Sequence, residues 1–180
     1  FTIKFAGNRF SPGMRLPIGA DPKRVIEVFN LITPRPTIFI SGGAGDMSEE
    51  DIRQTRVLID ECIASFAEKH KITIIDGGTQ AGVMDMIGDS RRNHQYKFPL
   101  IGVAPLQKVE WSGFKGNDPE AVLQDGHSHF VLMESDDWGD ESGMIVALTK
   151  AISANKAPMV GILINGGKIA EREVYLAGAS

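Results

Sequence analysis

The chain has 180 residues, of which 42% are hydrophobic and 23% charged, and its formal net charge is −4. This composition excludes a disordered chain, the mildly acidic balance disfavours a duplex-binding protein, and the single Cys allows no internal disulfide. The length predicts one domain over 1–180, with 1–36 as a less regular N-terminal segment. Because neither a membrane helix nor a signal peptide is visible, we expect a cytoplasmic protein without membrane or nucleic-acid partners.

Five short apolar runs predict buried strands, and most are apolar on both faces, as strands of a covered parallel sheet are. They span 37–41, 72–76, 100–104, 129–133 and 159–165. Helical patterns fill most of the intervals, at 22–31, 48–70, 79–95 and 140–156. Residues 105–128 are predicted as a long loop with a short helix at 119–123. This alternation predicts a doubly wound α/β fold, a mainly parallel sheet with helices on both faces.

Glycine clusters follow these strands, whose carboxyl ends share one edge of the sheet, the edge at which open α/β folds bind ligands. The glycine backbone approaches an anion closely, and free N–H groups at a helix start point toward it. Glycines can also serve only to make tight turns between strands and helices. Because they cluster after successive strands, we favour a binding site for a ligand with phosphate and ribose parts. The candidate ligand-binding residues are Gly42, Gly43, Ala44, Gly45, Gly77, Gly78, Thr79, Gly82, Val83, Ala104, Pro105, Glu134, Trp138, Gly139, Glu141, Asn165 and Gly166.

The best-known phosphate loops fit this pattern poorly. The segment 43–45 lacks the third glycine of the dinucleotide fingerprint, and 166–169 does not complete a GxxxxGK[ST] loop. Asp76 ends a strand where a ribose-binding acid would sit, but two glycines follow at once, which suggests a second anion loop instead.

An acidic loop at 134–141 allows several roles. Its carboxylates can hold Mg²⁺, act as a general base, accept ribose hydroxyls, or only cap the following helix. Glu141, expected one turn into that helix, is the candidate catalytic residue if the chain is an enzyme. Trp138 can stack on a base or anchor the loop. His127 and His129 share a strand face without an evident third ligand, so no metal site is predicted.

The segments 38–45, 75–84, 99–105 and 127–132, which include Asp-Gly-Gly-Thr-Gln-Ala-Gly-Val-Met, resemble the LSDAT family of the SLOG superfamily. That superfamily of Rossmann-like domains includes the N-terminal domain of TRPM channels and the Lonely Guy (LOG) enzymes, often labelled lysine decarboxylase-like. The resemblance extends over about 37–167. It implies a Rossmann-like fold, a small nucleotide-related ligand (AMP, ADP-ribose or NAD-derived), and a homo-oligomer as an option, since LOG-like relatives often dimerise.

By position, the resemblance implies that residues 42–44 line one wall of the ligand site and that residues 77–79 with Gly82 hold its phosphate. It also implies that Gly139 and Glu141 belong to a third loop of this site, the one after the strand 129–133. LOG enzymes carry Pro-Gly-Gly-x-Gly-Thr-x-x-Glu there, with an Arg upstream, and this chain has neither. The resemblance therefore favours binding or sensing of a nucleotide-derived ligand. The alternative is a nucleotide N-glycosidase, a LOG-like phosphoribohydrolase with Glu141 as general base. No further cofactor is assigned, and Mg²⁺ stays open.

Overall fold

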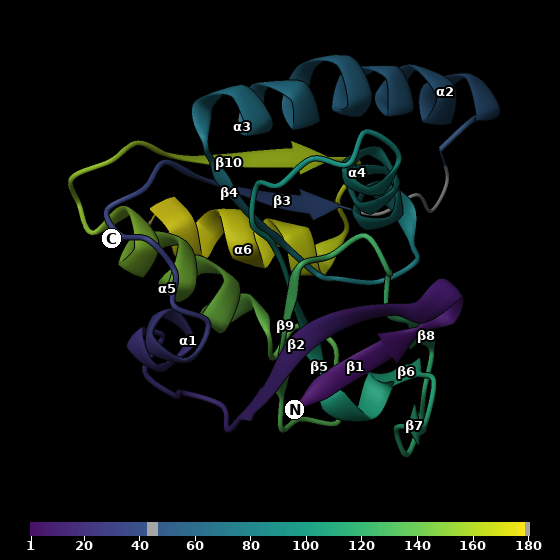
Figure 1. The fold of residues 1–180 in the computed structure, drawn as a ribbon, viewed down its shortest axis with the longest axis vertical. Helices are drawn as coiled ribbons and strands as arrows, with labels where there is room; N and C mark the ends of the chain where they lie inside the picture. Colours follow the sequence, from purple (N-terminus) through teal and green to yellow (C-terminus); the bar gives the residue numbers. More distant parts are fainter. Residues whose placement is uncertain (43–46, 179–180) are drawn as a thin grey trace.

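A seven-stranded sheet forms the centre of the computed structural model, which describes residues 1–42 and 47–178 (Figure 1). The strand order is β1-β2-β9-β5-β4-β3-β10, and the pairings are parallel except for β1 with β2. The strands are β1 (Thr2–Phe5), β2 (Arg9–Leu16), β3 (Thr37–Gly42), β4 (Thr73–Asp76), β5 (Leu100–Pro105), β9 (His129–Met133) and β10 (Met159–Ile164). The predicted doubly wound α/β architecture is confirmed.

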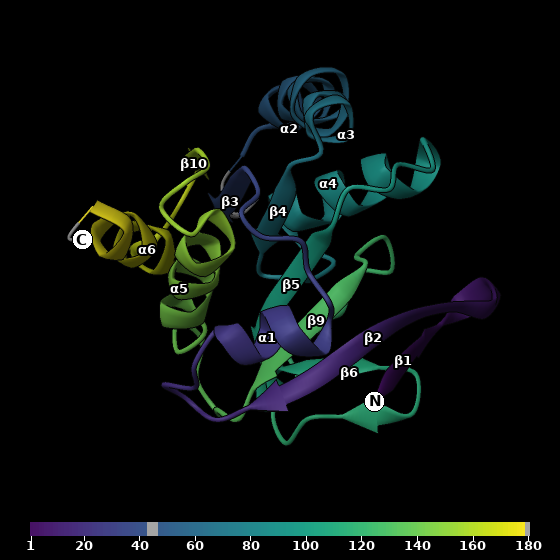
Figure 2. The same ribbon diagram turned by 60° about the vertical axis from the view of Figure 1, so that its left-hand side comes forward.

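Helices cover both faces of the sheet (Figure 2). On one face lie α2 (Glu49–Val57), the π-helical segment η2 (Leu58–Ala64), α3 (Ser65–His70) and α4 (Gly82–Asn93); on the other lie α1 (Lys23–Val28), α5 (Ser142–Ser153) and α6 (Lys168–Gly178). Alternate residues of β3 face the two layers: Ile38 and Ile40 pack under α2–α4, and Phe39 packs under α1 and α5. None of the described helices is both long and apolar enough to cross a membrane.

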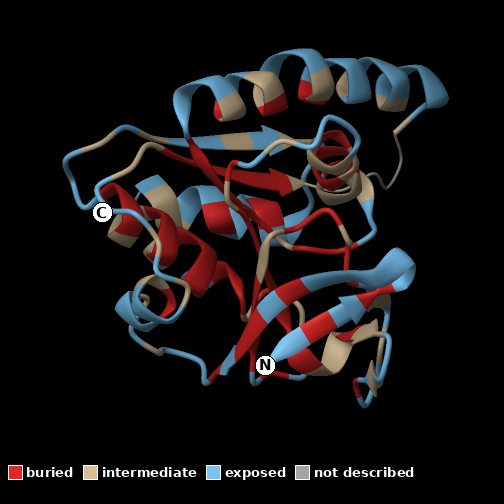
Figure 3. Cartoon of the chain, viewed as in Figure 1, coloured by how far each residue is buried: buried red, intermediate tan, exposed pale blue. Residues whose placement is uncertain are grey.

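The helix predicted at 48–70 begins as its sequence indicates. The Ser48 hydroxyl accepts the N–H of Asp51 at 3.1 Å, and the Asp51 carboxylate accepts the N–H of Ser48 at 3.3 Å. This reciprocal capping box satisfies N–H groups that the first turn leaves unpaired. The helix lies on the surface, with its outer side exposed and its inner side against the buried sheet (Figure 3).

Two segments differ from the prediction. Residues 1–36, expected to be irregular, supply β1, η1 (Ala6–Asn8) and β2, and β2 joins the central sheet beside β9. The short helix expected at 119–123 is wrong, because 105–128 contains the turn η3 (Leu106–Lys108) and a small sheet of β6 (Val109–Trp111), β7 (Phe114–Lys115) and β8 (Ala121–Val122). Strands of two or three residues are too short to show a period, and pairing with distant segments stabilises them.

Candidate functional site

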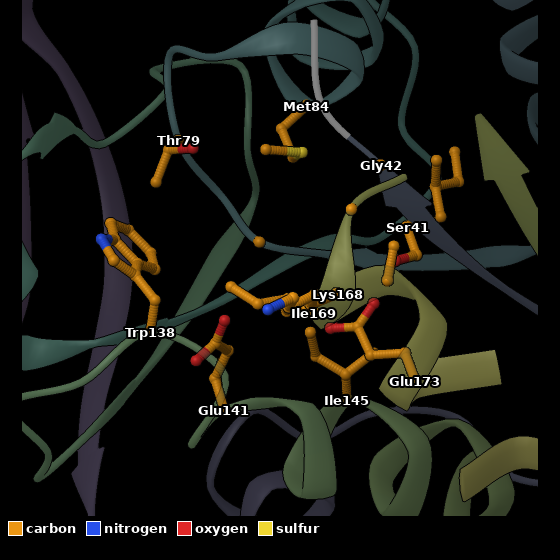
Figure 4. A pocket seen from close by; sticks show the side chains of 14 residues that line it. Ser41, Gly42, Thr79, Met84, Trp138, Glu141, Ile145, Lys168, Ile169 and Glu173 are labelled. Atoms are coloured by element: carbon orange, nitrogen blue, oxygen red, sulfur yellow. The ribbon is translucent and has the colours of Figure 1, made fainter. Parts of the chain in front are cut away.

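A cavity of about 420 Å³ lies at the carboxyl ends of β3 and β4 (Figure 4). Its walls come from the ends of these strands, the loop after β4, the start of α4, the loop between β9 and α5, and the first turns of α6. The lining residues are Ile40, Ser41, Gly42, Gly77, Thr79, Met84, Trp138, Glu141, Ile145, Gly167, Lys168, Ile169, Ala170 and Glu173. This is the sheet edge at which open α/β folds bind ligands.

Packing requires glycine at one of the two positions after β4, Gly78, but not at the other, Gly77. Gly78 has φ +70°, and a Cβ there would lie 2.7 Å from the Cα of Gly102 on β5, so the close approach of the two backbones requires glycine. At Gly77 a Cβ would make only ordinary contacts, the nearest at 3.7 Å to Met84. Since packing does not demand glycine at Gly77, its missing side chain leaves room in the cavity.

Asp76 stabilises the loop after β4 with its side chain. Its side chain is fully buried, and its Oδ1 accepts the N–H of Gly78 at 2.8 Å and lies 2.7 Å from Nε2 of His127. The loop is also joined to the small sheet, since the N–H of Gln124 donates to the carbonyl of Gly78 at 2.9 Å. Asp76 therefore fixes the loop and is not among the residues that line the cavity.

Glu141 lies in the opposite wall and is only 4% exposed. It is the N-cap residue of α5, which places it one turn earlier than the sequence predicted. Its Oε2 accepts the N–H of Gly139 at 2.7 Å. Burial, with a smaller contribution from the charges of Glu173 and Asp140, raises the pKa of Glu141 to about 7, although backbone hydrogen bonds oppose the shift. A carboxyl group that titrates near neutral pH is suited to proton transfer.

Helix α6 contributes to the cavity, although none of the residues predicted from the sequence lies in it. Lys168 and Glu173 line the cavity, and Nη1 of Arg172 donates to the carbonyl of Gly139 at 3.3 Å. Glu173 is 4% exposed, and burial raises its pKa. Residues four apart share one helix face, so the spacing of Lys168 and Arg172 on a helix placed at this edge was the signal that could have found these two residues. It does not mark Glu173.

Trp138 forms the side wall next to Glu141 (Figure 4). Its indole Nε1 donates to the carboxylate of Glu120 at 2.9 Å, just before β8. Lys108 holds Glu120 from the other side, with Nζ 2.6 Å from Oε1. The small sheet thus positions the indole at the cavity.

The structure brings together five of the predicted site residues. Gly42, Gly77, Thr79, Trp138 and Glu141 line the cavity. Gly139 is adjacent through its bond to Glu141, whereas the remaining described candidates do not line the cavity. These are Gly78, Gly82, Val83, Ala104, Pro105, Glu134, Asn165 and Gly166.

Three of these non-lining residues have clear structural positions. Val83 and Ala104 are buried in the core clusters, and Glu134 is exposed, with its N–H donating to the carbonyl of Leu16 at 2.8 Å. The predicted Gly43, Ala44 and Gly45 lie outside the described residues. Within 1–42 and 47–178, no group of three or more His, Cys, Asp or Glu side chains is placed to hold a metal ion.

Comparisons with known proteins gave one matching family model and similar solved structures. The LSDAT family model described as SLOG in TRPM, prokaryote, matches residues 35–178. No curated protein matches the chain. Among solved structures, the X-ray structure of TM1055, a target of the Northeast Structural Genomics Consortium, has a TM-score of 0.54 and 17% identity, over 80% of this chain and 69% of TM1055. The molybdenum cofactor binding protein from the phototrophic bacterium Rippkaea orientalis has a TM-score of 0.45 and 15% identity, over 81% and 72% of the two chains.

Proposed function

Because the chain belongs to the LSDAT family described as SLOG in TRPM, prokaryote, we propose that its cavity binds a nucleotide-derived ligand. The ligand would be a nucleoside monophosphate, ADP-ribose or another NAD-derived molecule. The observation that carries the proposal is the cavity at the carboxyl ends of β3 and β4, with the Gly77–Thr79 loop on one side and Glu141 on the other. Its volume of about 420 Å³ falls within the range of about 300–1,000 Å³ that is usual for small-molecule sites.

The two walls of the cavity suit different parts of such a ligand. On one side, α4 begins after Ala81, which supplies no side-chain cap, so its first N–H groups and the positive end of its dipole favour a phosphate. Thr79 and the Lys168 ammonium add a hydroxyl and a positive charge to the same cavity. On the other side, Glu141 and Glu173 can accept hydrogen bonds from sugar hydroxyls. The ligand would therefore lie with its phosphate toward the start of α4 and the Lys168 ammonium, and its sugar toward Glu141 and Glu173.

A second function, hydrolysis of the N-glycosidic bond, is favoured by the titration of Glu141 near neutral pH. In this reaction the Glu141 carboxylate takes a proton from water as the water oxygen bonds to the anomeric carbon. The C–N bond breaks, and the base leaves with the bonding electrons and takes a proton from solvent. Trp138, next to Glu141, would lie against the departing base.

Titration of the protein with AMP, ADP-ribose and NAD, with and without Mg²⁺, tests binding and turnover together. Trp111→Phe leaves Trp138 as the remaining tryptophan of the chain's two, so fluorescence then reports on the cavity. We expect saturable quenching with at least one ligand. Proton NMR of the same mixtures detects free base, and growth of its signals in the wild type but not in Glu141→Gln would establish the hydrolase. Absence of binding to all three ligands would contradict the proposed function.

A further inference from the structure

We propose that Glu173 is a specificity-determining residue that binds the vicinal 2′,3′-hydroxyls of a ribose, so that the cavity selects ribonucleotides over deoxy analogues. This inference rests on the proposed function and names the part of the ligand that the α6 wall recognises. No sequence motif marks Glu173; its place in the cavity follows from the packing of α6 against α5 and β3.

The position of the Glu173 carboxylate is fixed by neighbouring hydroxyls. Ser142, the first residue of α5, donates its hydroxyl to Oε1 at 3.1 Å. The Ser41 hydroxyl near the end of β3 favours the charged form of the carboxylate and so opposes the rise of its pKa. The group is 4% exposed and lines the cavity. A carboxylate that accepts the Ser142 hydroxyl still has free lone pairs, because two oxygens offer about four acceptor positions. Those positions can accept a pair of hydroxyls from a ligand.

Burial of this carboxylate calls for such a partner. Taking a charged carboxylate out of water is costly unless it is paired and hydrogen-bonded. Within 1–42 and 47–178, neither Glu173 nor Glu141 forms an ion pair with a Lys or Arg within 4 Å. Carboxyl groups in a cavity whose pKa values are raised by burial are candidates for a functional site. Ligand hydroxyls would add donors to the one that Ser142 supplies.

The charge of this wall also decides which ligand group it accepts. Glu141 and Glu173 lie close enough that the charge of one raises the pKa of the other. Two neighbouring carboxylates repel a phosphate and attract hydroxyl donors. In dinucleotide-binding folds a single acid at the ribose plays this role and favours a free 2′-hydroxyl over a 2′-phosphate. The same logic directs the ribose, and not a phosphate, to Glu173.

The order of side chains along this wall separates the roles of the two acids. Figure 4 shows Glu141 between Trp138 and Glu173, with Thr79 and Met84 across the cavity. One Glu141 oxygen is already used by the N–H of Gly139, and its place next to Trp138 suits the anomeric carbon. Glu173, farther from Trp138, then faces the hydroxyl side of the sugar.

Dissociation constants for AMP, 2′-deoxy-AMP and 3′-deoxy-AMP test this inference. We expect wild-type protein to bind AMP about tenfold more tightly than either deoxy analogue, since each lacks a hydroxyl bonded to a charged group. In Glu173→Gln this preference should fall below about threefold, with the affinity for the deoxy analogues little changed. Glu171→Gln, on the same helix and exposed, is the matched control and should keep the wild-type preference.

Ser142→Ala gives a second route that leaves Glu173 in place. Removing the hydroxyl that hydrogen-bonds to the carboxylate should reduce the preference for AMP by an intermediate factor, and circular dichroism would verify that both variants fold. Equal binding of all three nucleotides by the wild type, or a full preference retained in Glu173→Gln, would overturn this inference alone. Binding of none of them would overturn it together with the proposed nucleoside monophosphate site.

Discussion

The N–H of Gly139 donates to the carboxylate of Glu141 across 2.7 Å, within the loop that joins β9 to α5. This bond favours the charged form of Glu141, but burial favours the neutral form more strongly, and the pKa rises to about 7. The loop therefore holds an acid whose protonation changes within the physiological range, at the wall of the cavity.

A pH dependence of stability follows from Glu141. Its pKa of about 7 in the folded protein exceeds the ordinary 4.5. Between these values the folded chain holds a proton that the unfolded chain has lost, so the free energy of unfolding should fall as pH rises, by about 3 kcal/mol in all. Glu141→Gln should remove this component, so that the variant gains stability over the wild type at about pH 8 but not at about pH 4. Urea unfolding at both pH values measures the difference, and an unchanged difference at the two values would contradict the shift.

A methyl group at Gly77 should obstruct the cavity without harming the fold. In Gly77→Ala the new Cβ meets Met84 at 3.7 Å, an ordinary contact, so the free energy of unfolding should change by less than about 1 kcal/mol. Affinity for the nucleotide ligand should drop about tenfold, because the methyl occupies space beside the expected phosphate. Gly143→Ala, with no atom within 4 Å of the added Cβ, is the matched control and should bind normally. Unimpaired binding by Gly77→Ala would argue against a ligand at this loop.

The buried contact of Asp76 with His127 should be a strong stabilising interaction. Asp76→Ala leaves the Nε2 of His127 and the N–H of Gly78 without their acceptor, which should cost about 2–4 kcal/mol. In a double-mutant cycle with His127→Ala, the two changes should be non-additive by at least about 1 kcal/mol, because each removes the same contact. Denaturant titration of the four proteins provides the values. Additivity within about 0.5 kcal/mol would show that the pair is not coupled.

The bond from Trp138 to Glu120 should matter for ligands that carry a base. Glu120→Ala frees the indole, so affinity for AMP should fall about threefold to fivefold, whereas ribose 5-phosphate, which has no base to stack, should bind as before. Glu120→Gln keeps an acceptor for the indole N–H and should restore most of the affinity for AMP. Calorimetry of both ligands on the three proteins measures these effects. An equal loss of affinity for AMP and ribose 5-phosphate in Glu120→Ala would show that Glu120 does not act through the base.

The elements that could be predicted from the sequence are those that show a clear pattern of apolar residues along the chain. The strand 129–133 was predicted with its observed bounds because a strand buried on both faces appears as an uninterrupted apolar run. The first strands and the small sheet were missed for the opposite reason. Strand β2, which lies between β1 and β9, has exposed residues scattered among its buried ones and so shows no uninterrupted apolar run. Strands β6 to β8 are held by pairing across 109–122 rather than by an amphipathic pattern.

The sequence by itself determined the α/β class, the glycines at the strand ends, and the place of Glu141 next to the start of α5, because each depends on neighbours in the chain. The tertiary structure alone decided that Asp76 faces His127 instead of a ligand, and that Glu173 joins the cavity. The bond between Ser142 and Glu173 spans 31 residues, and the contact of His127 with Asp76 spans 51. Such contacts form only when helices and strands distant in sequence pack together, and no local pattern encodes them.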